Sequence, residues 1–422
     1  MRLLGTSIRD MAADLGINSA TLYAHYPSKA QILAALVQIG HEELHQRMQQ
    51  ALVDAGPEPA DQLAALVRAQ VLAHTDFPLL ALVANQELHA LTPEQAAPSL
   101  VLREQPRDLA LRVLRRGVQR GAFTAGDITL RERVILTMQP LDIPVNGGLL
   151  RALRFGDGPR IVLAAHGITA SAMSFRAVAR HLPARWSLVA LDLRGRGGSA
   201  GMPGPYGMSA HAADIVAAAE HLGSPLVLSG QSMGAYAALR AAVLRPELFT
   251  RLVLIDGGLP LPVPAGADPD QLLELTLGPA LARLRQSFPD VEAYLDLFKA
   301  HPALAGDWND DVAEYVRYDA TGEPGAIRSR VNGEAVYADG RDLLVNAASF
   351  GDDLLTLAVP TVLLYAPRGM FGEEPGLLPQ SIVDLWVARA PALRAELVEG
   401  TNHYTILMTD RAAKLIATRL TE

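Results

Sequence analysis

The pattern of hydrophobic and polar positions changes near residue 135. Before it, apolar residues recur at spacings of three and four among Ala, Leu, Arg, Glu and Gln, which is typical of amphipathic helices. After it, short apolar runs alternate with amphipathic helical stretches, and this alternation predicts a mostly parallel sheet with helices on both faces. The pattern therefore predicts an all-α region over residues 1–135, followed by a doubly wound α/β region over residues 136–422.

Six apolar runs in the second region have the length of buried strands. They cover residues 161–165, 187–191, 225–228, 252–255, 361–365 and 393–398. Between residues 257 and 356 the alternation stops, and helical pieces are mixed with proline and glycine. We therefore expect residues 257–356 to form a helical cap that is inserted between two strands of the sheet.

Composition narrows the class of protein. Of the 422 residues, 50% are hydrophobic and 19% are charged, which is typical of a globular chain, and the net charge of −8 gives no general attraction to nucleic acid. The absence of cysteine excludes disulfides, thiolate metal sites and thiol catalysis. The sequence has no signal-peptide pattern and no apolar run long enough to span a membrane, so we expect a cytoplasmic protein without a membrane partner.

A candidate nucleophile lies at Ser232. The apolar run at residues 225–228 leads into Gly230-Gln231-Ser232-Met233-Gly234 and then into a helical stretch, so a G-x-S-x-G pattern lies between a strand and a helix. Small residues two before and two after the serine allow the strand and the helix to approach closely, and the tight turn projects the hydroxyl above the sheet. The N–H of Met233, at the start of the helix, can then stabilise a negatively charged oxygen.

With this motif in its setting, residues 136–422 resemble the α/β-hydrolase family, whose fold is a mostly parallel, doubly wound sheet with a helical cap insertion. His166-Gly167 follows the predicted strand at 161–165, as in many members, and the resemblance implies that the N–H of Ile168 is the second donor of an oxyanion hole. Residues 192–199 (DLRGRGGS) resemble the family's D-x-R-G-x-G-x-S loop. We interpret that loop as structural, because acyl transfer needs none of its side chains.

The resemblance also implies a base. In this fold the chain order is nucleophile, acid and then histidine, and the histidine follows the last strand. The predicted strand at 393–398 is followed by a loop that contains His403 and by a terminal helix. His403 is therefore the expected base for the proton of Ser232.

The acid of the triad is less well defined by the sequence. In most of the family it follows the strand that corresponds to residues 361–365, but the loop here (APRGMFGEEP, residues 366–375) contains no aspartate. We favour Glu373 as the carboxylate that orients the imidazole of His403. Asp256 and Glu374 are the alternatives, and Asp256 follows the predicted strand at 252–255, where a minority of the family places its acid.

The resemblance implies a reaction class. A serine nucleophile argues against the epoxide hydrolases and haloalkane dehalogenases of this fold, which use aspartate in its place. What remains is acyl transfer to water through an acyl-enzyme, on carboxylic esters, lactones, thioesters or amides, with C–C bond hydrolysis and cofactor-free perhydrolysis as open alternatives. The cap region offers many apolar and aromatic side chains, so we expect an apolar to amphipathic small-molecule ester as substrate. We expect no metal and no organic cofactor.

The N-terminal region has a separate resemblance. Residues 6–29 (TSIRDMAADLGINSATLYAHYPSK) predict a helix, a glycine turn and a second helix, with Thr6 or Ser7 and Asn18 or Ser19 as the N-caps. This stretch resembles the DNA-binding head of TetR-family regulators, within a helix-turn-helix-like segment over residues 6–50 that lacks the family's first helix. The resemblance implies that several side chains would lie in the major groove or on phosphates: Ser19, Thr21, Tyr23, His25, Tyr26 and Lys29.

Two features argue against DNA binding by residues 1–50. The helix that normally precedes the two predicted here is absent, and the charges balance. Four basic residues (Arg2, Arg9, Lys29, Arg47) face four acidic ones (Asp10, Asp14, Glu42, Glu43), whereas operator-binding heads usually present a basic face. We expect a serine hydrolase with a helical appendage, and TetR-like helices suggest a homodimer by resemblance. The alternative is a DNA-binding regulator that uses the hydrolase-like fold as its ligand sensor.

Overall fold

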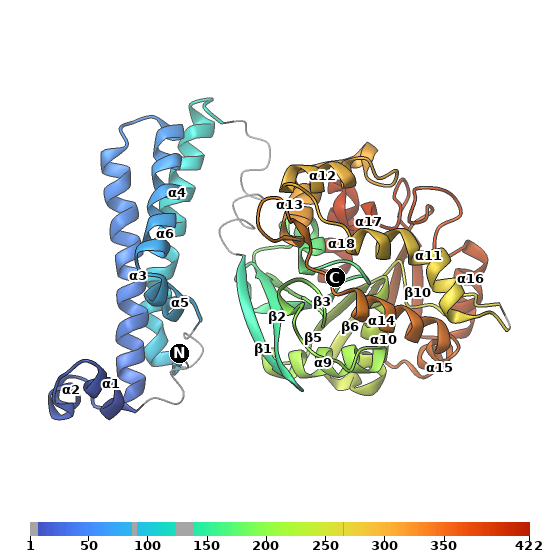
Figure 1. Ribbon diagram of the computed structural model, residues 1–422, viewed down its shortest axis with the longest axis horizontal. Helices are drawn as coiled ribbons and strands as arrows, with labels where there is room; N and C mark the ends of the chain where they lie inside the picture. The colour runs from blue at the N-terminus through green and yellow to red at the C-terminus, as the bar shows by residue number, and fades with distance from the viewer. Residues whose placement is uncertain (1–6, 87–90, 124–137, 265) are drawn as a thin grey trace. The chain divides into compact units, whose positions relative to one another are not determined.

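The computed structural model describes residues 7–86, 91–123, 138–264 and 266–422, and the chain divides into two compact units, residues 1–132 and 133–422 (Figure 1). Both are built around their own hydrophobic residues. Among the described helices, none combines the length and the apolar character that are needed to cross a membrane.

The first unit is a set of helices packed around one long helix, α3. Its helices are α1 (Ile8–Asp14), α2 (Ser19–His25), α3 (Lys29–Asp54), α4 (Pro59–Asp76), α5 (Pro78–Gln86) and α6 (Pro93–Gln119). Two N-caps follow the prediction: Ser7 forms a capping box with Asp10, and the Asn18 side chain accepts a hydrogen bond from the N–H of Ala20. Thr6, the other N-cap candidate for the first helix, lies outside the described residues.

The second unit contains an eight-stranded sheet in the order β1-β2-β4-β3-β5-β6-β9-β10. The strands are β1 (Gln139–Val145), β2 (Gly148–Phe155), β3 (Arg160–Ala165), β4 (Trp186–Leu191), β5 (Leu226–Gln231), β6 (Phe249–Ile255), β9 (Thr361–Tyr365) and β10 (Leu393–Leu397). The β1–β2 and β2–β4 pairs are antiparallel, and every other pair is parallel. The predicted fold class, an all-α region followed by a mostly parallel α/β sheet, is confirmed.

Helices cover both faces of the sheet (Figure 1). Side chains that alternate along β3 enter different cores: Leu163 and Ala165 pack on one face, and Val162 and Ala164 pack on the other. The first core is covered by α9 (Met208–Leu222), α10 (Met233–Leu244) and α16 (Gln380–Arg389). The second is covered by α8 (Arg176–Arg180), α17 (Thr405–Met408) and α18 (Asp410–Thr421). Burial on both faces explains why the central strands are continuous apolar runs.

Among the described residues between β6 and β9, five α-helices and one short strand pair are formed. They are α11 (Pro269–Leu284), α12 (Val291–Lys299), α13 (Asp310–Asp319), α14 (Gly333–Val345), α15 (Ser349–Thr356), and the antiparallel β7 (Ala320–Thr321) and β8 (Arg328–Ser329). We refer to residues 257–356 as the cap. Some cap residues pack into the two hydrophobic cores on the faces of the sheet: Phe350 lies in the first core, and Tyr294 and Val312 lie in the second.

A buried ion pair connects three elements at one side of the sheet. Arg194, in the loop after β4, donates from Nε and Nη2 to the two carboxylate oxygens of Asp214 on α9, at 2.5 and 2.7 Å. Arg194 also donates from Nη1 to the carbonyl oxygen of Pro203 and from Nη2 to the carbonyl oxygen of Asn146 in the β1–β2 turn. The side chains of Arg194 and Asp214 are 4% and 2% exposed, so removing one partner would leave the other charge without compensation in a nonpolar environment.

We predict that Asp214→Ala lowers the free energy of unfolding of this unit by about 3–5 kcal/mol, because Arg194 stays buried without its anion. Denaturant unfolding followed by tryptophan fluorescence reports on this unit alone, because Trp186, Trp308 and Trp386 all lie in it. Glu220→Ala is the matched control on the same helix, since the Glu220–Arg245 pair is largely exposed and should be worth at most about 1 kcal/mol. Equal effects of the two substitutions would contradict the prediction.

Candidate active site

Ser232 occupies a strained turn between β5 and α10. Its backbone angles are φ 53° and ψ −124°, a region that residues with a side chain rarely adopt. The turn is held from the neighbouring strand, because the N–H of Ser232 donates to the carbonyl oxygen of Ile255 at 2.9 Å. The serine hydroxyl is thereby presented at the carboxyl end of the sheet, at the start of a helix.

The two glycines of the motif are required by close backbone approaches. A Cβ atom on Gly230 would lie 2.2 Å from the carbonyl oxygen of Gly234, and one on Gly234 would lie 2.2 Å from the carbonyl oxygen of Ala165. Both distances are far inside van der Waals contact, and both partners are backbone atoms that cannot rotate away. The glycines therefore let β5, α10 and the end of β3 meet around Ser232.

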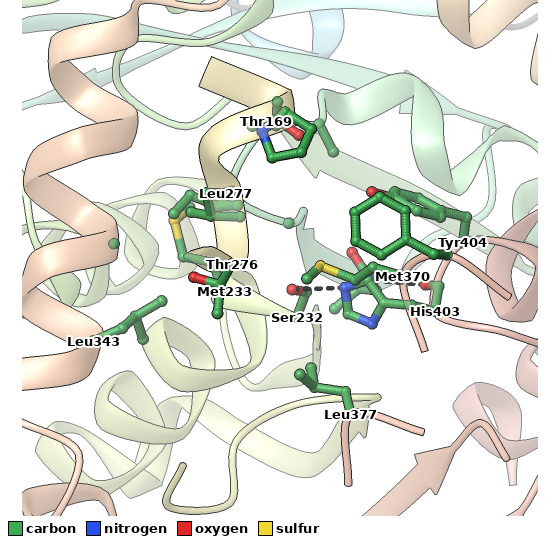
Figure 2. Close-up of a pocket in the computed structure, with 18 of the residues that line it drawn as sticks. Thr169, Ser232, Met233, Thr276, Leu277, Leu343, Met370, Leu377, His403 and Tyr404 are labelled. Carbon is green, nitrogen blue, oxygen red and sulfur yellow. Dashed lines mark hydrogen bonds between the residues drawn. The ribbon is translucent and has the colours of Figure 1, made fainter. Parts of the chain in front are cut away.

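His403 lies directly against the serine. It follows β10 and precedes α17, and its Nε2 is 3.0 Å from Oγ of Ser232 (Figure 2). The other ring nitrogen, Nδ1, lies 2.6 Å from Oδ2 of Asp256. A proton on Nδ1 that is donated to this carboxylate leaves Nε2 free to accept the hydroxyl proton of Ser232. The arrangement is a hydrogen-bonded chain from carboxylate to imidazole to hydroxyl.

The structure corrects the choice of Glu373 as the partner of His403. Glu373 and Glu374 are exposed, whereas Asp256 is completely buried at the end of β6 and touches the imidazole. Asp256 has a positive φ of 45°, and its second carboxylate oxygen accepts the N–H of Ala366 at 3.0 Å. The loop after β9 therefore contributes a backbone donor that holds this carboxylate, and the carboxylate that contacts His403 comes from the end of the adjacent strand.

The predicted oxyanion residues lie on two sides of the serine. Met233 begins α10, Ile168 follows β3, and both line the same cavity as Ser232. Gly167 approaches so closely that a Cβ atom there would lie 3.2 Å from Cβ of Ser232. Among the described residues, no acceptor takes a hydrogen bond from the N–H of Ile168 or Met233. Both donors are thus free for a ligand oxygen.

His166 connects this loop to the loop after β4 through both ring nitrogens. Its Nδ1 donates to the carbonyl oxygen of Gly167 at 2.7 Å, and its Nε2 accepts the N–H of Leu193 at 3.0 Å. Burial is the main cause that lowers the pKa of His166 to about 3. The ring therefore stays neutral and acts as a fixed bridge between the oxyanion loop and the loop after β4.

Arg196 links the oxyanion loop to the cap, a role that its sequence motif alone did not indicate. Its fully buried guanidinium donates from Nε to the carbonyl oxygen of Ile168 at 2.9 Å, and from Nη1 to the carboxylate of Asp339 on α14. Asp339 also accepts the N–H of Gly207 and lies 3.0 Å from Nε2 of His211. Burial by itself raises the pKa of Asp339, but His211 and Arg196 outweigh it and lower the value to about 2.

A largely apolar cavity of about 520 Å³ opens onto the serine. Figure 2 shows Ser232 hydrogen-bonded to His403, with Leu277, Leu343, Met370 and Leu377 around the pair. The cap contributes most of the wall through α11, α12, α13 and α14, and the loops at residues 366–379 and 403–408 complete it. Gln231, the second residue of the motif, donates from Nε2 to the carbonyl oxygen of His403 at 3.2 Å and so steadies the loop that carries the base.

Comparison with known proteins agrees with this geometry. A family model described as "Alpha/beta hydrolase family" matches residues 161–418. Models for bacterial regulatory proteins of the tetR family and for a tetracyclin repressor-like C-terminal domain match residues 3–36 and 56–139. The N-terminal resemblance seen in the sequence is thereby confirmed.

Individual relatives match only in part. N-formylmaleamate deformylase of Pseudomonas putida is 39% identical over 117 residues, which cover 27% of this chain and 44% of the relative. Lipase LipV of Mycobacterium tuberculosis is 33% identical over 114 residues, which cover 26% and 43%. The chain thus spans less than half the length of these curated relatives.

A solved structure extends the likeness to the whole second unit at the level of the fold. The thioesterase domain from the curacin biosynthetic pathway superposes with a TM-score of 0.55 at 22% identity, covering 68% of this chain and 99% of that domain. The family model matches more than half of the chain, in the region that holds the strained serine, the buried histidine and the cavity. The chain therefore belongs to the alpha/beta hydrolase family and carries TetR-like helices before its hydrolase unit.

Proposed function

We propose that the protein is a serine hydrolase that cleaves carboxylic esters, lactones or thioesters of apolar to amphipathic small molecules through an acyl-enzyme. The single observation that supports this most is the continuous chain from Asp256 through His403 to Ser232, with contacts of 2.6 and 3.0 Å. Two of the relatives, a lipase and a deformylase, are named for acyl-transfer hydrolysis. The apolar cavity supports a substrate with a hydrophobic portion.

In the proposed mechanism, Oγ of Ser232 attacks the acyl carbon while Nε2 of His403 accepts the hydroxyl proton. The former carbonyl oxygen becomes an oxyanion, which the N–H groups of Ile168 and Met233 stabilise. The bond to the leaving group then breaks, and His403 returns the proton to the departing oxygen or sulfur. Water repeats the sequence on the acyl-enzyme and releases the carboxylic acid. The side chain of Asp256 holds the imidazole in place and stabilises the imidazolium.

We predict that Ser232→Ala abolishes hydrolysis of a p-nitrophenyl ester series from acetate to decanoate, with a loss of at least about 10⁴-fold in kcat. Ser209→Ala, which removes an exposed hydroxyl from α9, is the matched control and should retain wild-type rates. Wild-type protein that hydrolyses none of the esters, or a Ser232→Ala variant that keeps its activity, would overturn the proposal.

The identity of the acid can be tested without a known substrate. A fluorophosphonate reacts with an activated serine, so its labelling rate reports on the state of Ser232 directly. We predict that Asp256→Asn slows labelling by about 10³-fold or more, because an amide can hold His403 in the wrong tautomer. Glu373→Gln and Glu374→Gln change the same charge at exposed positions and should label at the wild-type rate. Slow labelling in Glu373→Gln together with normal labelling in Asp256→Asn would restore the first choice.

A second candidate function, DNA-binding regulation, is supported by one feature of the N-terminal unit. The helix α2 follows the glycine turn of a tetR-type match, and none of its residues is buried, so its surface is free to contact a partner. The balanced charge of residues 1–50 weighs against it, because phosphate contacts supply most of the affinity for DNA.

We predict that the full-length chain binds a pool of genomic DNA fragments no more tightly than about 1 µM at physiological salt, which is the range of non-specific binding. Fluorescence anisotropy over a salt series measures this, and Tyr23→Ala on the exposed face of α2 is the control for a specific contact. Enrichment of one sequence with nanomolar affinity, lost in Tyr23→Ala, would establish the regulator instead.

A further inference from the structure

The cavity has one charged residue in its wall. Among the described residues that line it, Arg283 on α11 is the only Asp, Glu, Lys or Arg. Its side chain is 13% exposed, although it lies in a wall made mostly of Leu, Pro, Met and Phe. A guanidinium that is mostly buried in an apolar wall needs hydrogen-bond acceptors. The acceptors that contact Arg283 use only part of its donor capacity.

The hydrogen-bond partners of the Arg283 guanidinium contact only one of its nitrogen atoms, Nη1. Nη1 donates to the hydroxyl of Tyr294 and lies 3.3 Å from Oδ2 of Asp319, and the group packs over the ring of Phe298 at 5.0 Å. A guanidinium has five N–H donors, and Nη1 carries two of them. No described residue accepts a hydrogen bond from Nε or Nη2. Arg283 lines the cavity and Asp319 does not, so two donor groups without a described acceptor belong to a side chain of the cavity wall.

Further donors surround this position. Tyr315, Tyr404 and His301 line the same cavity, and no described residue accepts a hydrogen bond from either phenol. Burial raises the pKa of both tyrosines, so their hydroxyls stay protonated and can donate. The pKa of His301 is lowered mainly by burial and further by the charge of Arg283. Because Nδ1 of His301 accepts the N–H of Ala303 at 3.3 Å, the neutral ring carries its proton on Nε2.

This donor cluster, formed by Arg283, His301, Tyr315 and Tyr404, is close to the reacting atoms but separate from them. The ring of Tyr404 lies 5.6 Å from that of His403 and 5.5 Å from that of His301, measured between centroids. Tyr404 is therefore the member of the cluster next to His403, and His301 lies on from it. Ser232 and Arg283 line the same cavity, so a substrate that fills it can present an acyl carbon to Ser232 and its other end to the cluster.

We infer that the donor cluster binds a carboxylate at the far end of the substrate, so that the preferred substrates are half-esters of dicarboxylic acids with a short apolar chain between the two ends. A planar carboxylate matches the two donor groups of the guanidinium that have no described acceptor, and charge-assisted hydrogen bonds are the strongest available in a cavity whose described lining residues include no carboxylate. The inference rests on the proposed function, since it names the substrate class of the same site.

The test compares monomethyl with dimethyl esters of succinic to suberic acid, with hydrolysis followed in a pH-stat. We expect the wild type to prefer the half-ester over the diester by about 10-fold or more in kcat/KM at the best chain length. Arg283→Met should remove that preference by lowering kcat/KM for the half-ester far more than for the diester. The double variant Arg283→Met/Asp319→Asn should also lose the preference for the half-ester, and it leaves no buried carboxylate without a partner. It therefore separates loss of substrate recognition from misfolding of the cap.

Arg317→Met is the matched control, because it removes a cation from the cap at an exposed position that does not line the cavity. It should keep the wild-type preference. Equal rates on half-ester and diester in the wild type, or a preference that survives in the double variant, would overturn the inference.

Binding separates this inference from the proposed function. Calorimetric titration of Ser232→Ala should give tighter binding of the half-ester than of the diester, and Arg283→Met added to Ser232→Ala should abolish the difference. If wild type hydrolyses no ester, the proposed function fails, and the titration still decides whether the carboxylate site exists. Equal binding of the two esters to Ser232→Ala would refute it.

Discussion

The hydrogen bond between Nδ1 of His403 and the carboxylate of Asp256 joins the last loop of the fold to the centre of the sheet. It is buried, 2.6 Å long, and fixes the imidazole so that Nε2 faces Ser232. The other carboxylate oxygen is held by the N–H of Ala366 after β9. Three neighbouring strands, β5, β6 and β9, thus lead into Ser232, Asp256 and Ala366, and the parallel register brings their ends together.

The cap is connected to the catalytic machinery by more than packing. Arg196 bonds the carbonyl oxygen of Ile168 on one side and Asp339 of α14 on the other, so a cap helix and the oxyanion loop share one buried ion pair. Breaking such a pair leaves a buried charge without its partner, which is strongly destabilising. The walls of the cavity and the position of the oxyanion donors are therefore coupled, although they come from residues far apart in the chain.

The sequence was sufficient to predict those features whose pattern lies within a few neighbouring residues. Ser232 follows from five residues between a strand and a helix, and the central strands follow from apolar runs buried on both faces. The β1–β2 hairpin was missed because β1 is an edge strand that contains Pro140 and Pro144, which hide its pattern. The acid was misassigned to Glu373 because only the folded sheet decides which strand end reaches His403. Arg196 was missed for the same reason, since its partner Asp339 is 143 residues away.

The most direct test of the account is rapid-quench mass spectrometry of the wild-type protein during turnover of p-nitrophenyl acetate. The account predicts a burst of nitrophenol, equal in amount to the enzyme, together with an acetyl group on the peptide that contains Ser232. Two results would contradict the central role assigned to the Ser232–His403–Asp256 chain. One is turnover of the ester with the acyl group on another residue, and the other is a burst of nitrophenol without any covalent adduct.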